Sequence, residues 1–420
     1  MLVLAFSALL AGCGGGGETS VAVVEPVVEP WTPPAPVGAA QPDLVATADG
    51  DLLLSWIEPD GEGHVLSFAR FRDDAWSEPR AIARGTDWFV NWADTPHLLA
   101  TPDGALWAHW LQKSAAATYA YDVALVRSAD GGASWSAPVL VNDDGTPTEH
   151  GFVSLWPEGD ASLGIAWLDG RETFSPDAAT VAEPGGHGGH GGAAGAMTLR
   201  SARIDPGLQR HDEARIDGRV CDCCQTAAAR TARGALLAYR DRSEDEVRDV
   251  SVARLGHEGW QVLGTVHDDG WEMPACPVNG PAVAADGEQV VVAWYTAVGD
   301  TPQVRMAWSD DAGGRFGPPV TVDAGGAVQG RVGVVFADGL AWVLWMREEA
   351  GSQSLHLAGY GPGLALRHPG QELARLQGRG RGTGFPRLVA QGDDLRVVWT
   401  EVSGGVPSLR GAVIHPGRSR

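Results

Sequence analysis

The chain has 420 residues and a formal net charge of −22, with 57 glycines and 17 tryptophans. The acidic balance, together with the lack of a clustered Lys/Arg stretch, argues against a nucleic-acid partner, because phosphate binding requires a concentrated positive surface. The many glycines and the lack of a long helical period argue against a helical protein. They favour an all-β fold of short strands and tight turns.

The first element is a short apolar segment, MLVLAFSALLAGC, that ends at Cys13. It is too short to cross a bilayer as a helix. Its end, Leu-Ala-Gly-Cys, resembles the lipobox of bacterial lipoproteins, in which the cysteine is lipidated. The resemblance implies a signal peptide over residues 1–13, a lipid on Cys13, and an exported lipoprotein on the periplasmic side of the outer membrane or at the cell surface. A buried apolar segment followed by a glycine linker is the alternative.

Residues 14–30 are rich in Gly, Val, Glu and Pro, and this composition predicts a flexible tether. After the tether, one pattern recurs seven times: a short apolar strand, a tight turn, and an alternating strand that ends in an aromatic residue. The aromatic position is filled in turn by Trp56, Trp110, Trp167, Tyr239, Trp294, Trp345 and Trp399. Its spacing of roughly fifty to seventy residues is typical of four-stranded propeller blades.

We therefore predict an all-β fold: a single β-propeller of four-stranded antiparallel blades over residues 31–420, with seven blades favoured and six as the alternative. A Gly/His-rich insertion interrupts the pattern at about residues 170–196. Segment 31–37, WTPPAPV, matches the outer strands that begin at Trp76 and Trp135, whereas the last copy ends in SLRGAVI without such a strand. We expect this N-terminal segment to supply the missing strand and close the ring.

Two turns carry the signature Ser-x-Asp-x-Gly-x-x-aromatic. It resembles the Asp-box, or BNR repeat, of sialidases and related propellers, and the blade pattern extends the resemblance over nearly all of the chain from residue 31. In such a turn the Asp accepts hydrogen bonds from backbone amides and the Gly adopts a positive φ, so the motif is structural. Its residues here are Ser128, Asp130, Gly132 and Trp135 in one turn, and Ser309, Asp311, Gly313 and Phe316 in the other.

The resemblance to sialidases implies an arginine triad that holds a substrate carboxylate, an aspartate acid/base, and a tyrosine nucleophile activated by a glutamate. The candidates in this chain are Arg240, Asp241, Arg242, Arg331 and Arg387. The sequence departs from the family, because sialidases have six blades, their Phe/Tyr-Arg-Ile-Pro motif is replaced by QPDL at residues 41–44, and no tyrosine is placed as a nucleophile. These departures favour a ligand-binding propeller over a standard sialidase, with an exo-sialidase-like hydrolase of acidic glycans as the alternative.

Strand direction decides which residues meet at a ligand site. In Asp-box propellers the turns lie on one rim, so the starts of the inner strands and the ends of the second strands lie on the opposite rim, around the central channel. The polar residues expected at this ligand rim are His97, His150, Asn279, Glu58, Asp169 and Glu401. The alternative is that they are ordinary polar residues at loop edges. A glycan or a small acidic molecule is the expected ligand.

Four cysteines belong to the same rim: Cys221, Cys223 and Cys224 in the run CDCC, and Cys276 at the start of the next blade. In an exported protein, disulfides are the first expectation, including a bridge from Cys276 to the CDCC run. The competing prediction is a site for a soft metal ion, Cu or Zn, because closely spaced thiolates suit these ions. His187 and His190 of the insertion are either further ligands or low-complexity filler.

Overall fold

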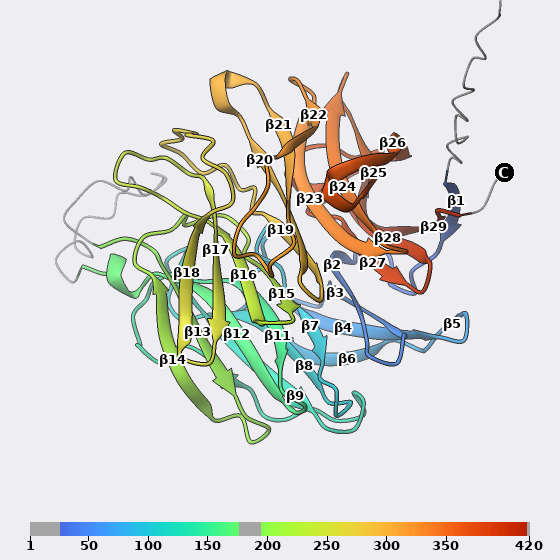
Figure 1. Cartoon of the computed structure of the whole chain (residues 1–420). Coiled ribbons are helices and arrows are strands. Elements are labelled where there is room, and N and C mark those ends of the chain that lie inside the picture. The colour runs from blue at the N-terminus through green and yellow to red at the C-terminus, as the bar shows by residue number, and fades with distance from the viewer. Residues whose placement is uncertain (1–25, 176–194, 418–420) are drawn as a thin grey trace, which may run out of the picture.

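The computed structural model describes residues 26–175 and 195–417, and within these ranges every strand belongs to one of seven sheets. The sheets are arranged as blades (Figure 1). The predicted all-β, seven-bladed propeller is therefore confirmed. The predictions for Cys13, His187 and His190 lie outside the described residues. No helix in the described part of the chain is long and apolar enough to span a membrane.

The first three blades follow one another in the sequence. Blade 1 contains β2 (Ala40–Ala46), β3 (Leu52–Asp60), β4 (Gly63–Arg72), β5 (Ala75–Trp76) and β6 (Arg80–Gly85). Blade 2 contains β7 (Leu98–Ala100), β8 (Leu106–Lys113), β9 (Tyr121–Ser128) and β10 (Val139–Leu140). Blade 3 contains β11 (His150–Glu158), β12 (Ser162–Asp169), β13 (Thr198–Ile204) and β14 (Arg210–Asp217). Blade 1 departs from the predicted four strands, because β5 and β6 both pair with β4 and share its outer edge.

The remaining four blades repeat the same order. Blade 4 contains β15 (Ala227–Thr231), β16 (Gly234–Arg240), β17 (Val250–Gly256) and β18 (Gly259–Thr265). Blade 5 contains β19 (Ala282–Asp286), β20 (Gln289–Thr296), β21 (Gln303–Ser309) and β22 (Val320–Ala324). Blade 6 contains β23 (Val328–Ala337), β24 (Leu340–Glu349), β25 (Ser352–Gly361) and β26 (Ala365–Arg375). Blade 7 contains β27 (Arg387–Gln391), β28 (Asp394–Ser403), β29 (Val406–His415) and β1 (Val27–Trp31).

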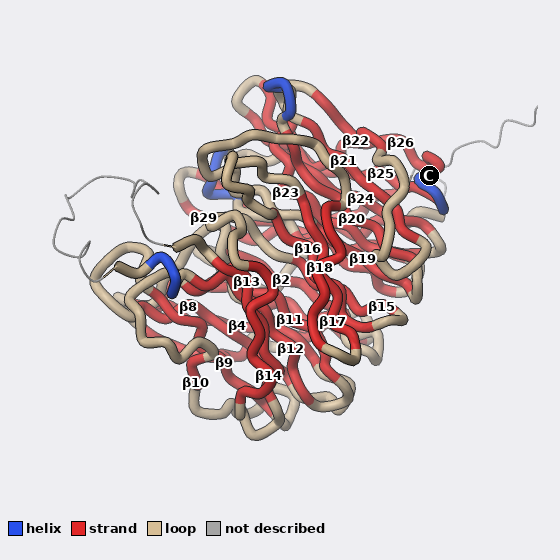
Figure 2. The backbone as a smooth tube through the Cα atoms, turned by 60° about the vertical axis from the view of Figure 1, so that its left-hand side comes forward, coloured by secondary structure: helices blue, strands red, loops and turns tan. Residues whose placement is uncertain are grey.

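Helical structure in the described ranges is limited to short 3-10 turns, seen as brief blue segments in Figure 2. They are η1 (Arg171–Thr173), η3 (Val298–Asp300), η4 (Pro362–Leu364) and η5 (Gly380–Thr383).

The hydrophobic core is divided among the spaces between blades. Each of the seven apolar clusters joins side chains from two neighbouring blades. Between blades 1 and 2, for example, Leu53 and Phe68 pack with Leu106 and Trp110. The alternating strands turn one face toward each neighbour, so every blade depends on both neighbours to bury its apolar faces.

The ring is closed by β1, which pairs antiparallel with β29 from Val27 opposite His415 to Trp31 opposite Gly411. The closing strand is therefore Val27–Trp31 and not the predicted segment 31–37, and it uses residues that the sequence assigned to the tether. The predicted segment contains three prolines at positions 33, 34 and 36, which cannot donate to a strand ladder. Trp31 also stacks on Trp76 of blade 1, with ring centroids 4.8 Å apart, and so links the closing blade to the first one.

The two signature turns form as predicted, with bonds that stay within the turn. In the first turn, the N–H of Gly132 donates to Ser128 Oγ (2.8 Å) and the N–H of Ser134 donates to Asp130 Oδ1 (2.9 Å). Gly132 has a φ of +88°, and a Cβ there would lie 2.2 Å from the Phe68 ring of blade 1.

The second turn repeats the arrangement. The N–H of Gly313 donates to Ser309 Oγ (3.0 Å) and that of Arg315 to Asp311 Oδ1 (2.8 Å). The aromatic residues that close the two turns, Trp135 and Phe316, pack against the apolar clusters between blades.

Candidate functional site

The cysteines lie where the chain enters blades 4 and 5. The connection from β14 to β15 carries the CDCC run, and the N–H of Cys221 donates to the carbonyl of Arg240 at the end of β16 (3.0 Å). Cys276 lies in the connection from β18 to β19. The ends of second strands and the starts of inner strands share one rim, so the four cysteines meet on the rim that the sequence predicted.

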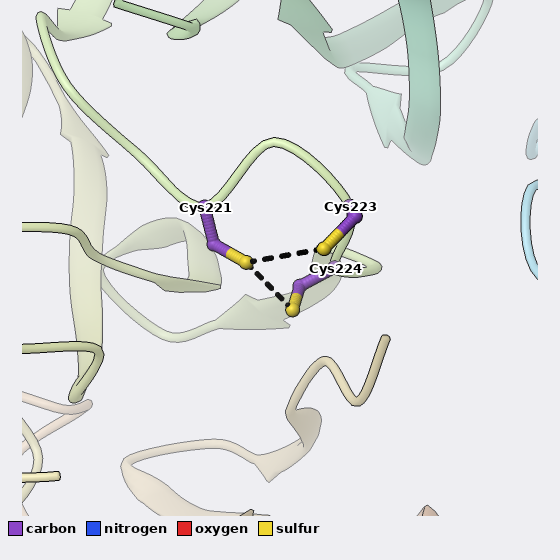
Figure 3. A group of neighbouring side chains, drawn as sticks. All are labelled: Cys221, Cys223 and Cys224. Carbon is purple, nitrogen blue, oxygen red and sulfur yellow. Dashed lines mark hydrogen bonds between the residues drawn. The ribbon is translucent and has the colours of Figure 1, made fainter. Parts of the chain in front are cut away.

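We define the cysteine site as these four cysteines with Asp222. Figure 3 shows its three neighbouring members of the CDCC run, Cys221, Cys223 and Cys224. Cys221 Sγ lies 3.8 Å from Cys223 Sγ and 2.8 Å from Cys224 Sγ. Ligand atoms of Asp222, Cys223 and Cys276 lie within 4.8 Å of one another. Cys223 thus belongs to both groups and connects Cys276 to the CDCC run. All four residues carry free thiols, so the bridge expected from Cys276 stays a prediction.

Arg248 supplies the positive charge of the site. Its side chain is almost fully buried, with Nη1 3.3 Å from Cys221 Sγ and 3.5 Å from Asp222 Oδ1. Nη2 donates to Glu246 Oε2 (2.8 Å), and Glu246 also pairs with Arg242 (2.5 Å). Glu246, Arg242 and Arg248 thus form a salt-bridged corner of the rim.

The four thiols differ in acidity. Burial opposes ionisation of Cys221, but contacts from Cys223 and Cys224 and the charge of Arg248 together hold its pKa well below the usual thiol value. The contact with Cys223 lowers the pKa of Cys276, whereas the contact with Cys221 raises the pKa of Cys223, and burial raises that of Cys224. Cys276 is exposed and Cys221 is buried, so an incoming ligand reaches the site from the Cys276 side.

Next to the cysteine site lies a group of acids that the sequence analysis did not identify. Tyr121 donates its hydroxyl to Glu149 Oε1 (2.6 Å) and contacts Asp94 Oδ2 (3.3 Å), while Asp94 Oδ1 accepts the N–H of Phe152 (2.8 Å). Burial raises the pKa of Asp94 to about 7. Burial also raises the pKa of Glu149, to about 8, and the charges of Asp94, Asp222 and Cys276 add to the increase.

These residues lie in the connections that precede the inner strands. Glu149 directly precedes the rim residue His150, and Asp94 lies three positions before His97. A reading of the whole connections, and not only of the strand starts, would have found both acids. Arg248 lies in another kind of connection, between the second and third strands of blade 4, β16 and β17, and a reading of that connection would have found it.

The candidate arginines are occupied by protein groups. Arg240 is buried and donates to the carbonyls of Asn279 (2.8 Å), Tyr295 (2.7 Å) and Arg248 (2.5 Å). Arg331 is also buried and donates to Thr383 Oγ1 and to the carbonyl of Gly384, each at 2.8 Å.

Arg387 donates to Thr95 Oγ1 (2.8 Å) and lies 3.5 Å from Asp43 Oδ1. The three arginines thus stabilise connections between blades. Near them, burial and the charge of Asp217 raise the pKa of Asp241 to about 6.

The predicted rim residues also have protein partners. His97 pairs with Asp43 (3.2 Å), Glu58 accepts from Ser67 (3.0 Å), and Glu401 pairs with Arg410 (3.2 Å). Asn279 accepts the N–H of Arg331 through Oδ1 (2.8 Å). For these residues the local contacts match the alternative of polar groups at loop edges. His150 and Asp169 lie together in a different cluster.

No protein-family model matches the sequence, and no functionally curated protein matches it either. Solved structures share the fold. The polysaccharide lyase Uly1 has 8% identity and a TM-score of 0.51, over 92% of this chain and 91% of that one. An α-L-arabinanase of Penicillium chrysogenum has 12% identity and a TM-score of 0.48, over 94% and 99%. A mutant Trypanosoma rangeli sialidase has 10% identity and a TM-score of 0.39, over 76% and 53%. At these identities the likeness extends to the propeller fold alone.

Proposed function

We propose that this chain is an exported, membrane-tethered propeller that binds a soft metal ion, Cu(I) or Zn(II), at its cysteine site. The observation that carries the proposal is that four free thiols from two separate connections meet, with Cys223 common to both groups of ligands. Thiolates are the preferred ligands of Cu(I) and a common ligand of Zn(II).

The spacing of the sulfurs supports a metal centre. In a tetrahedral thiolate site with metal–sulfur bonds of about 2.3 Å, neighbouring sulfurs lie about 3.8 Å apart. The distance from Cys221 Sγ to Cys223 Sγ is 3.8 Å. The distance from Cys221 Sγ to Cys224 Sγ, 2.8 Å, is shorter, so Cys224 has to move outward by about 1 Å to act as a ligand.

The charges of the site also suit a metal ion. A thiol has to lose its proton to coordinate a metal, and the lowered pKa values of Cys221 and Cys276 favour two thiolates. The positive charges of Arg248 and Arg242 offset part of the negative charge of these thiolates and of Asp222. The exposed Cys276 gives the ion a route into an otherwise buried site.

Metal content and thiol count together test this proposal. The full chain is isolated from a periplasm, its copper and zinc are measured, and its thiols are counted after denaturation without reductant. We expect about one copper or zinc ion per chain at the cysteine site of the wild type, counted as the difference in metal content between the wild type and Cys223→Ser. Cys223→Ser should lose it, because Cys223 joins the two groups of ligands. Cys13→Ser is the matched control and should keep the metal.

Two results would reject the metal site. In both, the wild type contains no more metal than Cys223→Ser. If its thiols are then all oxidised, the cysteines form disulfides. If the four thiols are reduced, neither sequence prediction for this rim is correct.

The membrane anchor is a separate part of the proposal and rests on the lipobox resemblance at Cys13. Fractionation of cells that produce the Cys13→Ser chain tests it. The variant should move from the membrane fraction to the soluble fraction, and an unchanged distribution would reject the anchor.

A hydrolase of acidic glycans is the second candidate, favoured by one observation. The sialidase resemblance implies a tyrosine nucleophile paired with a glutamate, and Tyr121 donates to Glu149 at 2.6 Å. The Tyr121 side chain is fully buried and the candidate arginines are occupied, so this function ranks below metal binding. Hydrolysis of a fluorogenic sialoside by the wild type, abolished in Tyr121→Phe, would support it. An inactive wild type would remove it.

A further inference from the structure

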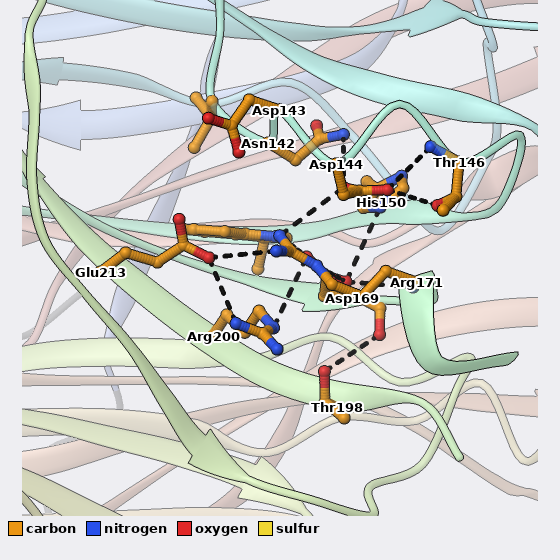
Figure 4. Close-up of polar contacts among 12 residues, drawn as sticks. Asn142, Asp143, Asp144, Thr146, His150, Asp169, Arg171, Thr198, Arg200 and Glu213 are labelled. Carbon is orange, nitrogen blue, oxygen red and sulfur yellow. Dashed lines mark hydrogen bonds and ion pairs between the residues drawn. The ribbon is translucent and has the colours of Figure 1, made fainter. Parts of the chain in front are cut away.

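A second cluster of metal-type ligands lies in blade 3 and contains no cysteine (Figure 4). His150 opens β11, Asp169 ends β12, and the two residues are direct partners in the strand ladder. Asp144 comes from the connection between β10 and β11. One ligand atom from each of the three residues lies within 4.8 Å of the other two.

The contacts of His150 decide which ring nitrogen carries a proton. The imidazole is fully buried. Nδ1 lies 3.1 Å from the carbonyl oxygen of Tyr121 and 3.4 Å from Asp122 Oδ1. Both oxygens are acceptors, so Nδ1 has to be the protonated nitrogen.

The other nitrogen, Nε2, then presents a lone pair to two carboxylates. It lies 3.0 Å from Asp144 Oδ2 and 3.7 Å from Asp169 Oδ1, and no hydrogen-bond donor among the described residues reaches it. Three groups with lone pairs therefore face one another in a buried space. A metal ion between the three groups would stabilise such an arrangement.

We propose that Asp144, His150 and Asp169 bind a divalent ion of the Mn(II) or Zn(II) class. With bonds of about 2.1 Å from such an ion to each atom, separations of 3.0 and 3.7 Å correspond to ligand angles of about 90° and about 125°. Both angles occur in ordinary coordination polyhedra. Imidazole and carboxylates suit these ions better than Cu(I), so the site goes beyond the thiol centre and is independent of it.

Surrounding groups hold the two carboxylates in place. The N–H of Thr146 donates to Asp144 Oδ1 (2.9 Å) and leaves Oδ2 directed at His150. The indole N–H of Trp167 donates to Asp169 Oδ2 (2.7 Å). Hydrogen bonds of this kind orient metal ligands in proteins.

Arg171 is the competing cation, and it pairs with both oxygens of Asp169. Its backbone N–H and its Nε donate to Asp169 Oδ1 (3.0 and 2.8 Å), and its Nη2 donates to Oδ2 (2.7 Å) and lies 3.6 Å from Asp144 Oδ2. A metal ion would therefore share Asp169 Oδ1 with Arg171.

Around a neutral His150, however, three carboxylates are present: Asp122, Asp144 and Asp169. Arg200 Nε also lies 3.9 Å from Asp169 Oδ2, and both arginines pair with a fourth carboxylate, Glu213. Two guanidiniums do not balance four carboxylates, and a bound dication supplies the missing charge.

Manganese titration of the full chain tests the site, because cysteine thiolates bind Mn(II) poorly. The electron paramagnetic resonance signal of free Mn(II) is measured as protein is added, and zinc content is measured in parallel. The wild type should bind one Mn(II) ion that zinc displaces. Cys223→Ser should bind it equally well.

Asp144→Asn and Asp143→Asn are the matched pair. They remove the same charge from adjacent positions, but Asp143 is exposed and pairs with Arg210 outside the cluster. We expect Asp144→Asn to weaken Mn(II) binding at least tenfold and Asp143→Asn to leave it unchanged. His150→Gln should behave like Asp144→Asn, and thermal unfolding without metal shows whether each variant is folded.

Two results would overturn the proposal. One is a wild-type chain that binds neither Mn(II) nor zinc outside the cysteine site. The other is equal binding by the Asp144→Asn and Asp143→Asn variants.

Discussion

The two rims of the propeller satisfy their polar groups in different ways. On the rim that carries the Asp-box turns, which we call the turn rim, Ser128 and Asp130 accept hydrogen bonds from amides no more than four residues away. The opposite rim surrounds the central channel, and we call it the channel-mouth rim. There, Arg240 donates to one carbonyl of the next connection and one of the next blade, and Asp94 accepts the N–H of Phe152. The first rim is assembled by each hairpin alone, whereas the second exists only when the blades are in place. Buried titratable groups gather on the second rim, which is where function is expected.

Opening the ring should have the largest effect on this contrast. Deletion of residues 1–31 removes β1, its ladder with β29 and the Trp31 packing, and should cost about 5 kcal/mol from lost hydrogen bonds and buried apolar area. Deletion of residues 1–25 is the control and should have little effect. Calorimetry gives the two unfolding temperatures. Equal temperatures would mean that β1 does not hold the ring closed.

Removing Arg248 should damage the channel-mouth rim alone. Arg248→Gln leaves Arg242 as the remaining buried cation beside Asp222 and Glu246, and should cost about 3 kcal/mol, measured by urea unfolding. It should also raise the pKa of Cys221, seen in the pH dependence of alkylation. Arg230→Gln is the control, because its pair with Glu158 is exposed and should be worth less than about 1 kcal/mol. Equal losses in the two variants would contradict a special role for Arg248.

A glycine pair tests the turn rim. Gly132→Ala places a Cβ against Phe68 at a φ of +88°, and should cost about 2 to 4 kcal/mol. Gly131→Ala has a φ of +69° but open space around it, and should cost only about 1 kcal/mol. Urea unfolding measures both. Neither change should alter the metal content, and a loss of metal would mean that the two rims are coupled.

A change in pH dependence tests the buried acids of the channel-mouth rim. Asp94 and Glu149 have pKa values raised to about 7 and about 8, so the folded protein holds their protons more tightly than the unfolded chain does. Their contribution to stability is therefore complete below about pH 4 and is lost as the pH rises to about 8. Glu149→Gln should flatten the fall of the unfolding temperature over this range. Glu258→Gln, in the exposed turn between β17 and β18, should not.

The contrast between the rims also explains what the sequence could predict. The repeated aromatic positions and the spacing within the Asp130 turn are local patterns, and from them the seven blades and the two turns follow. The rim position of the cysteines follows from strand direction. The acids at Asp94 and Glu149 depend on contacts that run between blades, and no local pattern reports such contacts. The closing strand was misplaced because the sequence WTPPAPV resembles those of other outer strands. Its prolines, however, lack the backbone N–H groups that a strand ladder requires.

The pairing of Val27 with His415 also affects the order of folding. During synthesis, the first strand of the propeller has to wait for the last one, because its partner is made at the end of the chain. Until then β1 is unpaired and the face of blade 1 that packs against blade 7 is uncovered. The chain is then an open stack of blades with exposed edges. Closure is a contact between the most distant segments of the sequence, and such contacts form slowly. The final step of folding should therefore be the docking of β1 on β29. A chaperone that shields free strand edges would be needed for longest at these two strands.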